Sequence, residues 1–274
     1  MTHPFDLSGT VALVVGGRGY LGRRICTALL GAGAKVCAAD RPRQSPAAAH
    51  DTDDAPLAGA HQFDVDAADP ASVDALVSSV LAIHGGIDTL VFSVTTKPDD
   101  FYEAYTECSL AGWREILTAE LDGAFLVTQR VGVEMARRGG SMILLSSIYG
   151  VVGNDQRIYE GANLDQIYGE KAGTGGRIYA HAGYATAKGG LIALARYLAA
   201  YWGHAGVRVN CVSPGGVSHP AENAEFVRRY SERVPLGRKA SVDDVSGAVL
   251  YLASPAASYV TGHNLLVDGG WTAW

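Results

Sequence analysis

The chain of 274 residues has only four cysteines, and they stand singly. Cys26, Cys37, Cys108 and Cys211 show neither the Cys-x-x-Cys spacing nor the Cys/His spacing typical of metal and redox sites. The sequence therefore predicts no metal site. Isolated cysteines also make a reduced cytoplasm the simplest compartment.

Positive charge and long apolar runs are scarce as well. The 22 lysines and arginines are outnumbered by 28 aspartates and glutamates, which gives a net charge of −6, and no basic run forms a local patch. Apolar runs stay below the roughly 20 residues that span a bilayer. The opening MTHPFDLSG lacks the charged-then-apolar order of a signal peptide. We therefore expect neither nucleic acid nor a membrane as a partner.

What the sequence does contain is typical of a globular α/β protein. Hydrophobic residues make up 48% and charged residues 18%, far from the composition of disordered chains. The 34 glycines against 10 prolines indicate tight turns beside a ligand. A chain of this length is compatible with one domain, which we expect over residues 1–274.

Short apolar runs alternate with stretches of helical periodicity along the chain. The predicted strands are 11–15, 35–39, 62–65, 89–92, 141–146, 207–212 and 264–267, and the predicted helices are 20–30, 71–84, 112–138, 182–203 and 242–253. This alternation predicts a single-domain, Rossmann-type doubly wound parallel sheet of about seven strands flanked by helices. Ligands bind such sheets at the carboxyl ends of the strands.

A glycine-rich turn follows the first predicted strand. Gly16, Gly19 and Gly22 lie where a backbone approaches a pyrophosphate at a helix N-terminus. Tight turns alone produce similar patterns, but Asp40 ends the second strand about 18 residues later, near the position of the carboxylate that binds the ribose of NAD. We therefore expect NAD, with NADP less favoured.

NADP remains an alternative cofactor, because Arg18, Arg41 and Arg43 offer cations for its 2′-phosphate. Asp64 follows the third strand and either contacts the adenine side or is a solvated strand end. The predicted cofactor-binding residues in this half of the chain are Gly16, Arg18, Gly19, Tyr20, Leu21, Gly22, Asp40, Arg41, Asp64 and Val65.

Tyr184 and Lys188 lie four residues apart at the start of an apolar helix, on one face. A phenol titrates near pH 10, and a fixed ammonium together with an oxidised nicotinamide lowers that pKa. Tyr184 then serves as acid or base. Ser146 and Ser147 end the fifth strand, and Ser147 is our choice to meet the substrate oxygen. A Tyr and a Lys four apart are otherwise commonly surface residues, so the strand order carries the prediction.

The order of these features resembles the short-chain dehydrogenase/reductase family over essentially the whole chain. The resemblance includes YATAK, NCVSPGGV at 210–217 and TGHNLLVDGG at 261–270. It implies that Ser147 orients the substrate, that Tyr184 is the acid/base, and that Lys188 tunes Tyr184 and holds the nicotinamide ribose. It also implies that Tyr184, Lys188, Pro214, Gly215 and Val217 complete the cofactor site. Residues 218–232 would form a mobile substrate loop.

A narrower resemblance points to oxidoreductases of nonulosonic, legionaminic-type sugar pathways. It is carried by SSIYGVVG at 146–153, RIYEG at 157–161, YLAAYWG at 197–203 and the ending DGGWTAW. It implies a polar, polyhydroxylated or sugar-derived substrate contacted by Tyr149, Arg157, Tyr159 and Glu160. Packing tyrosines in an inserted loop explain the same residues equally well.

The sequence departs from the family pattern in four places. Phe92, Ser93, Val94 and Thr95 replace the usual Asn-Asn-Ala-Gly, which implies different packing beside the cofactor. Glu120 replaces the helix asparagine that supports a proton-relay water, and it holds that water, titrates, or is a solvated helix residue. An insertion at about 154–178 separates Ser147 from Tyr184 and is expected to cap the substrate. Tyr20 lies in the glycine-rich turn, and the spacing of the glycines there resembles that of extended family members, including sugar epimerases.

The leading hypothesis is NAD(P)-dependent interconversion of a secondary alcohol and a ketone on a small polar molecule, with Ser147, Tyr184, Lys188 and Glu120 as catalytic candidates. One alternative is an epimerase or dehydratase that retains NAD. Another is a non-enzymatic nucleotide-sensing homologue. The family habit of pairing long helices implies a homo-oligomer, either a dimer or a tetramer.

Overall fold

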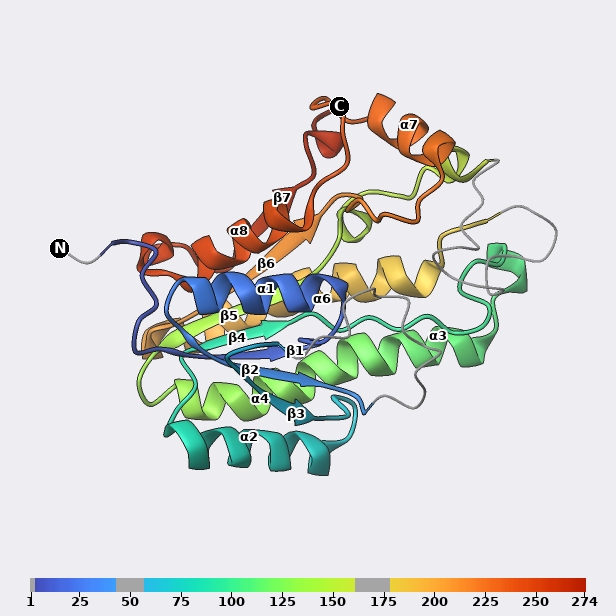
Figure 1. The fold of residues 1–274 in the computed structure, drawn as a ribbon. Helices are drawn as coiled ribbons and strands as arrows, with labels where there is room; N and C mark the ends of the chain where they lie inside the picture. Colours follow the sequence, from blue (N-terminus) through green and yellow to red (C-terminus); the bar gives the residue numbers. More distant parts are fainter. Residues whose placement is uncertain (1–2, 43–56, 161–177) are drawn as a thin grey trace.

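The computed structural model describes residues 3–42, 57–160 and 178–274. A parallel sheet of seven strands runs through the described residues in the order β3-β2-β1-β4-β5-β6-β7 (Figure 1). The strands are β1 (Val11–Val15), β2 (Lys35–Asp40), β3 (Ala60–Asp64), β4 (Thr89–Phe92), β5 (Gly140–Leu145), β6 (Val207–Pro214) and β7 (Asn264–Val267). The predicted doubly wound parallel sheet is confirmed.

Helices cover both faces of the sheet. They are α1 (Tyr20–Gly31), α2 (Pro70–His84), α3 (Leu110–Leu117), α4 (Gly123–Met135), α6 (Ala182–Trp202), α7 (Ala224–Glu232) and α8 (Val242–Ala253). Helices α2, α4 and α6 pack over one apolar core, and α1 and α8 pack over a second core on the opposite face. Side chains alternate between the two cores along a strand, so that Leu13 faces the first core and Val14 the second.

Short turns of 3-10 helix connect these elements. They lie at Tyr105–Glu107, Ile148–Gly150, Gln156–Tyr159, Gly203–Ala205, Pro255–Ala257 and Trp271–Ala273. In the sheet, β1 pairs with β2 on one side and with β4 on the other. The order of strands therefore reverses beside β1, which is where a parallel sheet opens a ligand crevice.

The predicted helix over 112–138 is not one regular helix. A π-helical segment, Thr118–Asp122, joins α3 to α4. An extra residue in a helical turn shifts the side-chain register, and such segments occur frequently at functional sites. Glu120 lies in this segment and is buried, so its placement follows from the irregular turn.

The segment 218–232, expected as a mobile loop, contains the helix α7 (Figure 1). Asn223 caps this helix by accepting from the backbone N–H of Glu225 at 2.8 Å. Its buried residues, Phe226 and Tyr230, lie four apart, and the rest of the helix is largely charged. Phe226 and Tyr230 form the inward face of this helix, and its charged residues form the outward face.

In the part of the chain that the structure describes, no helix is long and apolar enough to span a membrane. The four cysteines are free thiols. Burial raises the pKa of the Cys26 and Cys211 thiols to about 12 and that of Cys37 to about 11. These three thiols stay protonated near neutral pH, which makes them poor nucleophiles.

Candidate active site

The glycine turn after β1 is packed too closely for any side chain at three positions, Gly16, Gly17 and Gly22. Gly16 has a positive φ of 85°, and a Cβ on it would lie 2.5 Å from the carbonyl oxygen of Ser93. A Cβ on Gly22 would lie 1.9 Å from the carbonyl oxygen of Gly16. Among the described residues, no side chain caps α1 at Gly19. Such an uncapped helix N-terminus suits a phosphate.

Asp40 stands at the end of β2 with its carboxylate fixed by the backbone. Its oxygens accept from the N–H of Arg18 at 3.0 Å and the N–H of Arg41 at 2.9 Å. The guanidinium of Arg18 donates at 2.7 Å to Asp64, and that of Arg41 donates at 3.2 Å to Asp66. Both cations are therefore already paired with carboxylates. The Asp64 side chain remains largely exposed at the strand end while it holds Arg18, and its contact with the adenine stays a prediction.

A cavity of about 150 Å³ opens beside these residues. Its lining includes Gly16, Gly19, Asp40, Arg41, Val65 and Thr95. Tyr20 turns away from it, because its hydroxyl donates to the carbonyl of Ser218 at 2.7 Å and its ring lies 5.1 Å from that of His219. Arg43 lies outside the described residues. Five of the ten dinucleotide residues predicted in this half of the chain, Gly16, Gly19, Asp40, Arg41 and Val65, thus surround one space, whereas Tyr20 joins the glycine turn to Ser218 and His219.

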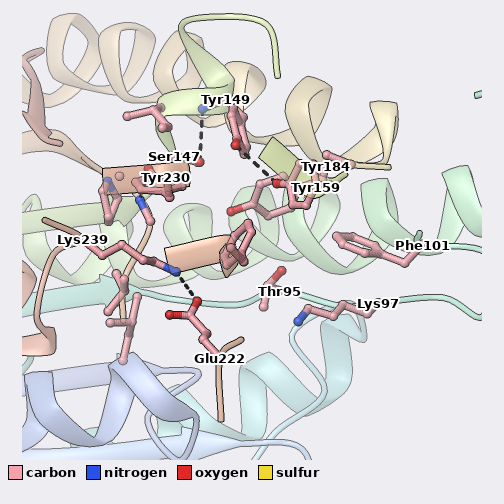
Figure 2. Close-up of a pocket in the computed structure, with 18 of the residues that line it drawn as sticks. Thr95, Lys97, Phe101, Ser147, Tyr149, Tyr159, Tyr184, Glu222, Tyr230 and Lys239 are labelled. Carbon is pink, nitrogen blue, oxygen red and sulfur yellow. Dashed lines mark hydrogen bonds and ion pairs between the residues drawn. The ribbon is translucent and has the colours of Figure 1, made fainter. Parts of the chain in front are cut away.

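A larger cavity of about 310 Å³ adjoins the first, since Thr95 lines both. Figure 2 shows the labelled side chains that enter it. The sequence-predicted residues in its wall are Leu21, Ser147, Tyr149, Tyr159, Tyr184, Pro214, Gly215 and Val217. The tertiary structure therefore brings the end of β5, the start of α6 and the segment after β6 to one place.

The two serines after β5 have different roles. Ser146 donates its hydroxyl to the carbonyl of Lys188 at 2.7 Å, which ties the start of α6 to the end of β5. Ser147 accepts from the N–H of Tyr149 at 3.2 Å and retains a proton to donate. Both line the cavity, but only the Ser147 hydroxyl contacts the phenol of Tyr184, whose pKa it lowers through a side-chain hydrogen bond. This difference supports the choice of Ser147.

Tyr184 lies in the cavity wall with an acidity set by competing effects. Burial raises the pKa of its phenol, Lys188 lowers it, Glu120 raises it, and Ser147 lowers it; the net pKa is above the ordinary value of 10.0. The expected influence of Lys188 is present, but burial outweighs it in the protein alone. Further positive charge is needed in the site before the phenol ionises near neutral pH.

Lys188 is buried and holds several partners at once. Its ammonium lies 2.9 Å from a carboxylate oxygen of Glu120 and 5.4 Å from the ring centroid of Tyr184. It also donates to the carbonyl oxygens of Val94 and Leu145, each at 3.2 Å. Burial lowers the pKa of Lys188, but the attraction of Glu120 more than offsets this, so the pKa is raised. The ammonium is therefore charged and fixed.

Glu120 is fully buried, so its interpretation as a solvated helix residue is wrong. One carboxylate oxygen faces Lys188, and the other accepts from the hydroxyl of Thr95 at 2.8 Å. Thr95 in turn lines both cavities. A chain of polar groups thus runs from Tyr184 past Lys188 and Glu120 to Thr95.

Within the segment that replaces Asn-Asn-Ala-Gly, Ser93 and Val94 make contacts through the backbone, whereas Thr95 bonds Glu120 through its side chain. Ser93 donates its N–H to the carbonyl of Val15 at 2.8 Å, and Val94 offers its carbonyl to Lys188. Backbone groups are the same whatever the side chain. This explains how the changed sequence keeps β1, β4 and α6 in register around the site.

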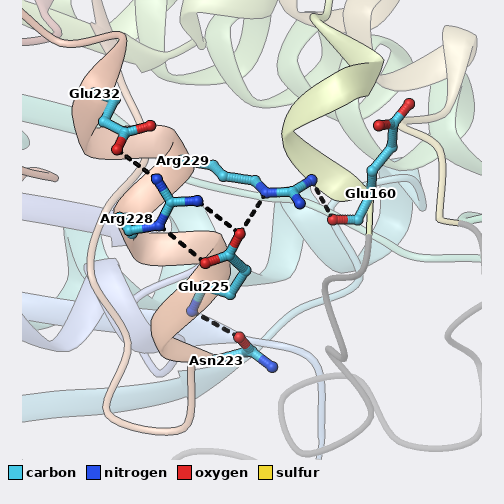
Figure 3. A network of polar contacts seen from close by, with 6 residues as sticks. All are labelled: Glu160, Asn223, Glu225, Arg228, Arg229 and Glu232. Atoms are coloured by element: carbon cyan, nitrogen blue, oxygen red, sulfur yellow. Dashed lines mark hydrogen bonds and ion pairs between the residues drawn. The ribbon is translucent and has the colours of Figure 1, made fainter.

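Two of the four polar residues expected to contact the substrate reach the cavity. Tyr149 and Tyr159 line it, and their hydroxyls lie 3.3 Å apart. Arg157 instead pairs with Asp155 at 2.8 Å and is largely exposed. Glu160 accepts through its carbonyl from Arg229 of α7 at 2.5 Å (Figure 3).

The first part of the predicted insertion is tied to α7, because Arg233 also pairs with Asp155. Residues 161–177, the greater part of that insertion, lie outside the described residues. The capping function predicted for them therefore stays a prediction.

Three charged residues in the cavity wall, Lys97, Glu222 and Lys239, were not singled out from the sequence. Glu222 and Lys239 form an ion pair whose side chains are only 6% and 3% exposed. Both line the larger cavity (Figure 2). Glu222 lies within the segment 218–232 that was expected to bind substrate, but nothing in the sequence singles it out, and Lys239 lies outside that segment. Their pairing depends on how the chain before α7 folds back against the segment before α8.

The fold and site define a dinucleotide-binding α/β oxidoreductase with a Ser, Tyr and Lys set. A family model described as "short chain dehydrogenase" matches residues 10–162, and one described as "Enoyl-(Acyl carrier protein) reductase" matches residues 170–272. The chain belongs to the short-chain dehydrogenase family. The chain is therefore an oxidoreductase that acts on CH–OH and C=O groups, as the sequence predicted.

Similar proteins cover nearly the full length. The chain is 34% identical to a D-threitol dehydrogenase of Mycolicibacterium smegmatis over 98% of this chain and 95% of the relative. It is 30% identical to a galactitol 2-dehydrogenase (L-tagatose-forming) of Cereibacter sphaeroides, over 98% of each.

Two solved structures have the same fold. A short chain dehydrogenase from Leptospira borgpetersenii with bound NAD+ has a TM-score of 0.81 and 27% identity, over 97% of this chain and 94% of that one. A gluconate 5-dehydrogenase from Burkholderia cenocepacia, in complex with NADP and tartrate, has a TM-score of 0.78 and 28% identity, over 99% and 98%. Nicotinamide cofactors of both kinds are thus bound by proteins of this fold.

Proposed function

We propose that this chain is an NAD-dependent dehydrogenase that interconverts a secondary alcohol and a ketone on a polyhydroxylated small molecule. The observation that carries the proposal is the meeting of Ser147 and Tyr184 in a cavity that adjoins the dinucleotide cavity through Thr95. Hydride transfer requires that the reacting carbon and the nicotinamide lie together, and the shared wall provides that proximity.

The residues present fit a nicotinamide dinucleotide. The turn at Gly16 and Gly22 has no room for a Cβ, and the smaller cavity contains Asp40 at its edge. We infer that the turn binds the pyrophosphate, that Asp40 binds the adenosine ribose, and that Pro214, Gly215 and Val217 line the nicotinamide. The chemistry that this cofactor supplies when bound is hydride acceptance from the carbinol carbon.

NAD is favoured over NADP by the charges around Asp40. The carboxylate repels a 2′-phosphate, and the two nearest guanidinium groups, Arg18 and Arg41, are engaged by Asp64 and Asp66. Neither cation is available for a phosphate without breaking an ion pair.

Tyr184 removes the proton of the substrate hydroxyl during oxidation and returns it during reduction. Ser147 donates its hydroxyl to the substrate oxygen and so orients it. Lys188 holds its charge beside Tyr184 and stabilises the phenolate. Lys188 is also the residue that we infer to hold the nicotinamide ribose.

Glu120 acts here as a positioning residue and as a step in proton exchange. Its carboxylate fixes the ammonium of Lys188, and its second oxygen contacts the hydroxyl of Thr95. We infer that a proton leaves Tyr184 along this path toward the cavity lined by Thr95. In this path the carboxylate of Glu120 takes the place of the asparagine side chain and the proton-relay water of the family pattern.

The substrate class is supported by what the relatives are named for. D-threitol and galactitol dehydrogenases bear names of polyols, and the cavity wall of this chain offers hydroxyl and charged groups to such a molecule. The narrower resemblance to nonulosonic sugar enzymes stays a prediction, as do the cytoplasmic location and the dimer or tetramer.

The test is turnover of a polyol panel with NAD+ and with NADP+, followed at the nicotinamide absorbance band. We expect NADH formation with at least one four- to six-carbon polyol, and turnover of that polyol about 10²- to 10⁴-fold slower by Tyr184→Phe. Product isomerisation without net NADH would instead establish the epimerase alternative. Near-normal turnover by Tyr184→Phe would refute the proposed acid/base.

A further inference from the structure

Glu222 and Lys239 form an ion pair inside the larger cavity (Figure 2). The ammonium of Lys239 also lies 4.7 Å from the ring centroid of Phe226 and 5.2 Å from that of Tyr230. Both rings belong to α7 and line the same cavity. The cation is thus held between a carboxylate and two aromatic faces, with little contact with water.

The pair is fixed by the backbone on both sides. The segment after β6 pairs with Ala240, whose carbonyl accepts from Ser218 at 2.8 Å and whose N–H donates to Gly216 at 2.9 Å. One carboxylate oxygen of Glu222 accepts from the N–H of His219 at 3.2 Å. Withdrawal of the Glu222 side chain would break its contact with His219, and the contacts of Ala240 fix the backbone beside Lys239.

Stability alone does not account for this pair. Burying two charges carries a desolvation cost that their attraction barely offsets, and apolar residues of similar size are often neutral or stabilising in such places. Burial also lowers the pKa of Lys239, and the attraction of Glu222 counters that lowering only in part. The pair faces an open cavity, so a ligand that bonds to both groups explains its presence.

The ligand chemistry follows from the groups offered. The ammonium is a donor and the carboxylate an acceptor, and they are adjacent. Two neighbouring hydroxyl groups present the complementary pattern, because each hydroxyl both donates and accepts. A carboxylate ligand would meet the negative charge of Glu222 beside the cation. The other cation in the lining, Lys97, lies by the rings of Phe101 and Tyr102.

We propose that Glu222 and Lys239 together bind two adjacent hydroxyl groups of the substrate, away from the carbon that is oxidised at Tyr184. The pair thereby selects a neutral polyol over a simple alcohol and over a sugar acid. This inference rests on the proposed dehydrogenase function.

The experiment compares four substrates in the wild type and in the variants Glu222→Gln and Lys239→Met. The substrates are the best polyol from the panel, its deoxy analogue lacking one hydroxyl distal to the reacting carbon, the sugar acid of the same chain length, and 2-butanol. Loss of a charge-assisted hydrogen bond is expected to raise KM for the polyol about tenfold to a hundredfold. We expect kcat/KM for 2-butanol to stay within about twofold, since 2-butanol has no distal hydroxyl for the pair to bind.

Two controls guard against misfolding. The double variant Glu222→Gln/Lys239→Met leaves no unpaired charge in the wall, and its melting temperature and NADH affinity are measured beside those of the single variants. The variant Glu232→Gln is matched to Glu222→Gln, because Glu232 pairs with Arg228 on the exposed side of α7. We expect Glu232→Gln to leave every kinetic constant unchanged.

Three outcomes overturn the inference. One is that a folded Lys239→Met keeps the wild-type preference for the polyol over its deoxy analogue. Another is an equal loss of activity on polyol and 2-butanol. The third is a sugar acid as the best substrate, with activity lost in Lys239→Met and raised in Glu222→Gln. Failure of the dehydrogenase proposal looks different, because the wild type would then turn over neither the polyol nor 2-butanol.

Discussion

The ammonium of Lys188 lies 2.9 Å from the carboxylate of Glu120, and both side chains are almost completely buried. Removing one member of a buried pair leaves an uncompensated charge, so this contact is both structural and electrostatic. It fixes the group that stabilises the Tyr184 phenolate, and it also weakens the positive field at that phenol. The contact therefore affects both stability and the pH at which the enzyme works.

Tyr184→Phe removes the proton-transferring hydroxyl and keeps the ring that packs by Phe101. We expect kcat to fall by about 10²- to 10⁴-fold, the usual contribution of general acid–base catalysis. The dissociation constant for NADH, measured by nucleotide fluorescence, should change little. Loss of NADH binding would mean that the hydroxyl is needed for the cofactor site instead.

Glu120→Gln leaves the ammonium of Lys188 buried without its carboxylate. We expect a loss of unfolding free energy of about 3 kcal/mol or more, measured by urea denaturation. The matched control is Glu115→Gln, since Glu115 contacts Thr96 at 3.1 Å in a more exposed position and should lose little. Equal losses in both variants would contradict the special role of the buried pair.

The stability difference also depends on pH. The folded pKa of Lys188 is raised above its ordinary value of 10.5, so its stabilisation is fully present below that pH and is lost as the pH rises through the folded pKa. Above about pH 10.5 the wild type should therefore lose stability more steeply than Glu120→Gln. Parallel curves in this range would exclude the linkage.

The pH dependence of turnover should shift when Glu120 is neutralised. The negative charge of Glu120 raises the pKa of Tyr184, so Glu120→Gln or Glu120→Asn lowers it. Oxidation requires the phenolate, so the rising limb of kcat/KM for alcohol oxidation should move to lower pH. The wild-type profile measured in parallel is the reference. A shift toward higher pH would show that loss of charge on Lys188 dominates instead.

Asp64 holds the guanidinium of Arg18 away from any phosphate. Asp64→Asn should therefore remove the carboxylate that neutralises Arg18, while the carbonyls of Asp40 and Arg41 still hold the guanidinium in place. We expect KM for NADP+ to fall by a few-fold, with little change for NAD+.

Asp40→Ser should raise KM for NAD+ by about tenfold through loss of a charged hydrogen bond to the ribose. If Asp40→Ser left the NAD+ constants unchanged, Asp40 would not be the ribose ligand.

Arg229 joins α7 to the segment after β5, because it donates to the carbonyl of Glu160 (Figure 3). Exposed contacts of this kind contribute little to stability, so Arg229→Ala should melt close to the wild-type temperature. It should raise KM for substrate more than KM for NAD+, since Tyr159 and Phe226 in the cavity wall lose their alignment. Arg228→Ala is the matched control, as Arg228 contacts only Glu225 and Glu232 among the described residues.

Much of the fold could be predicted from local sequence. The strands Val11–Val15, Thr89–Phe92 and Asn264–Val267 have the predicted bounds, because an uninterrupted apolar run bounded by glycine or polar residues has few alternatives. The turn at Gly16 and Gly22 could be predicted in the same way, because the backbone there leaves no space for a side chain. These features depend on neighbours in the chain, which the sequence shows directly.

The remaining features depend on residues that meet only after folding. The sequence determined that Glu120 is unusual and that Tyr184 and Lys188 share a helix face. The tertiary structure decided that Glu120 is buried against Lys188, that α7 is a helix, and that Glu222 and Lys239 meet across 17 residues in a cavity wall. A charged residue has the same appearance in a sequence whether it is solvated or buried, and only its packed neighbours decide which.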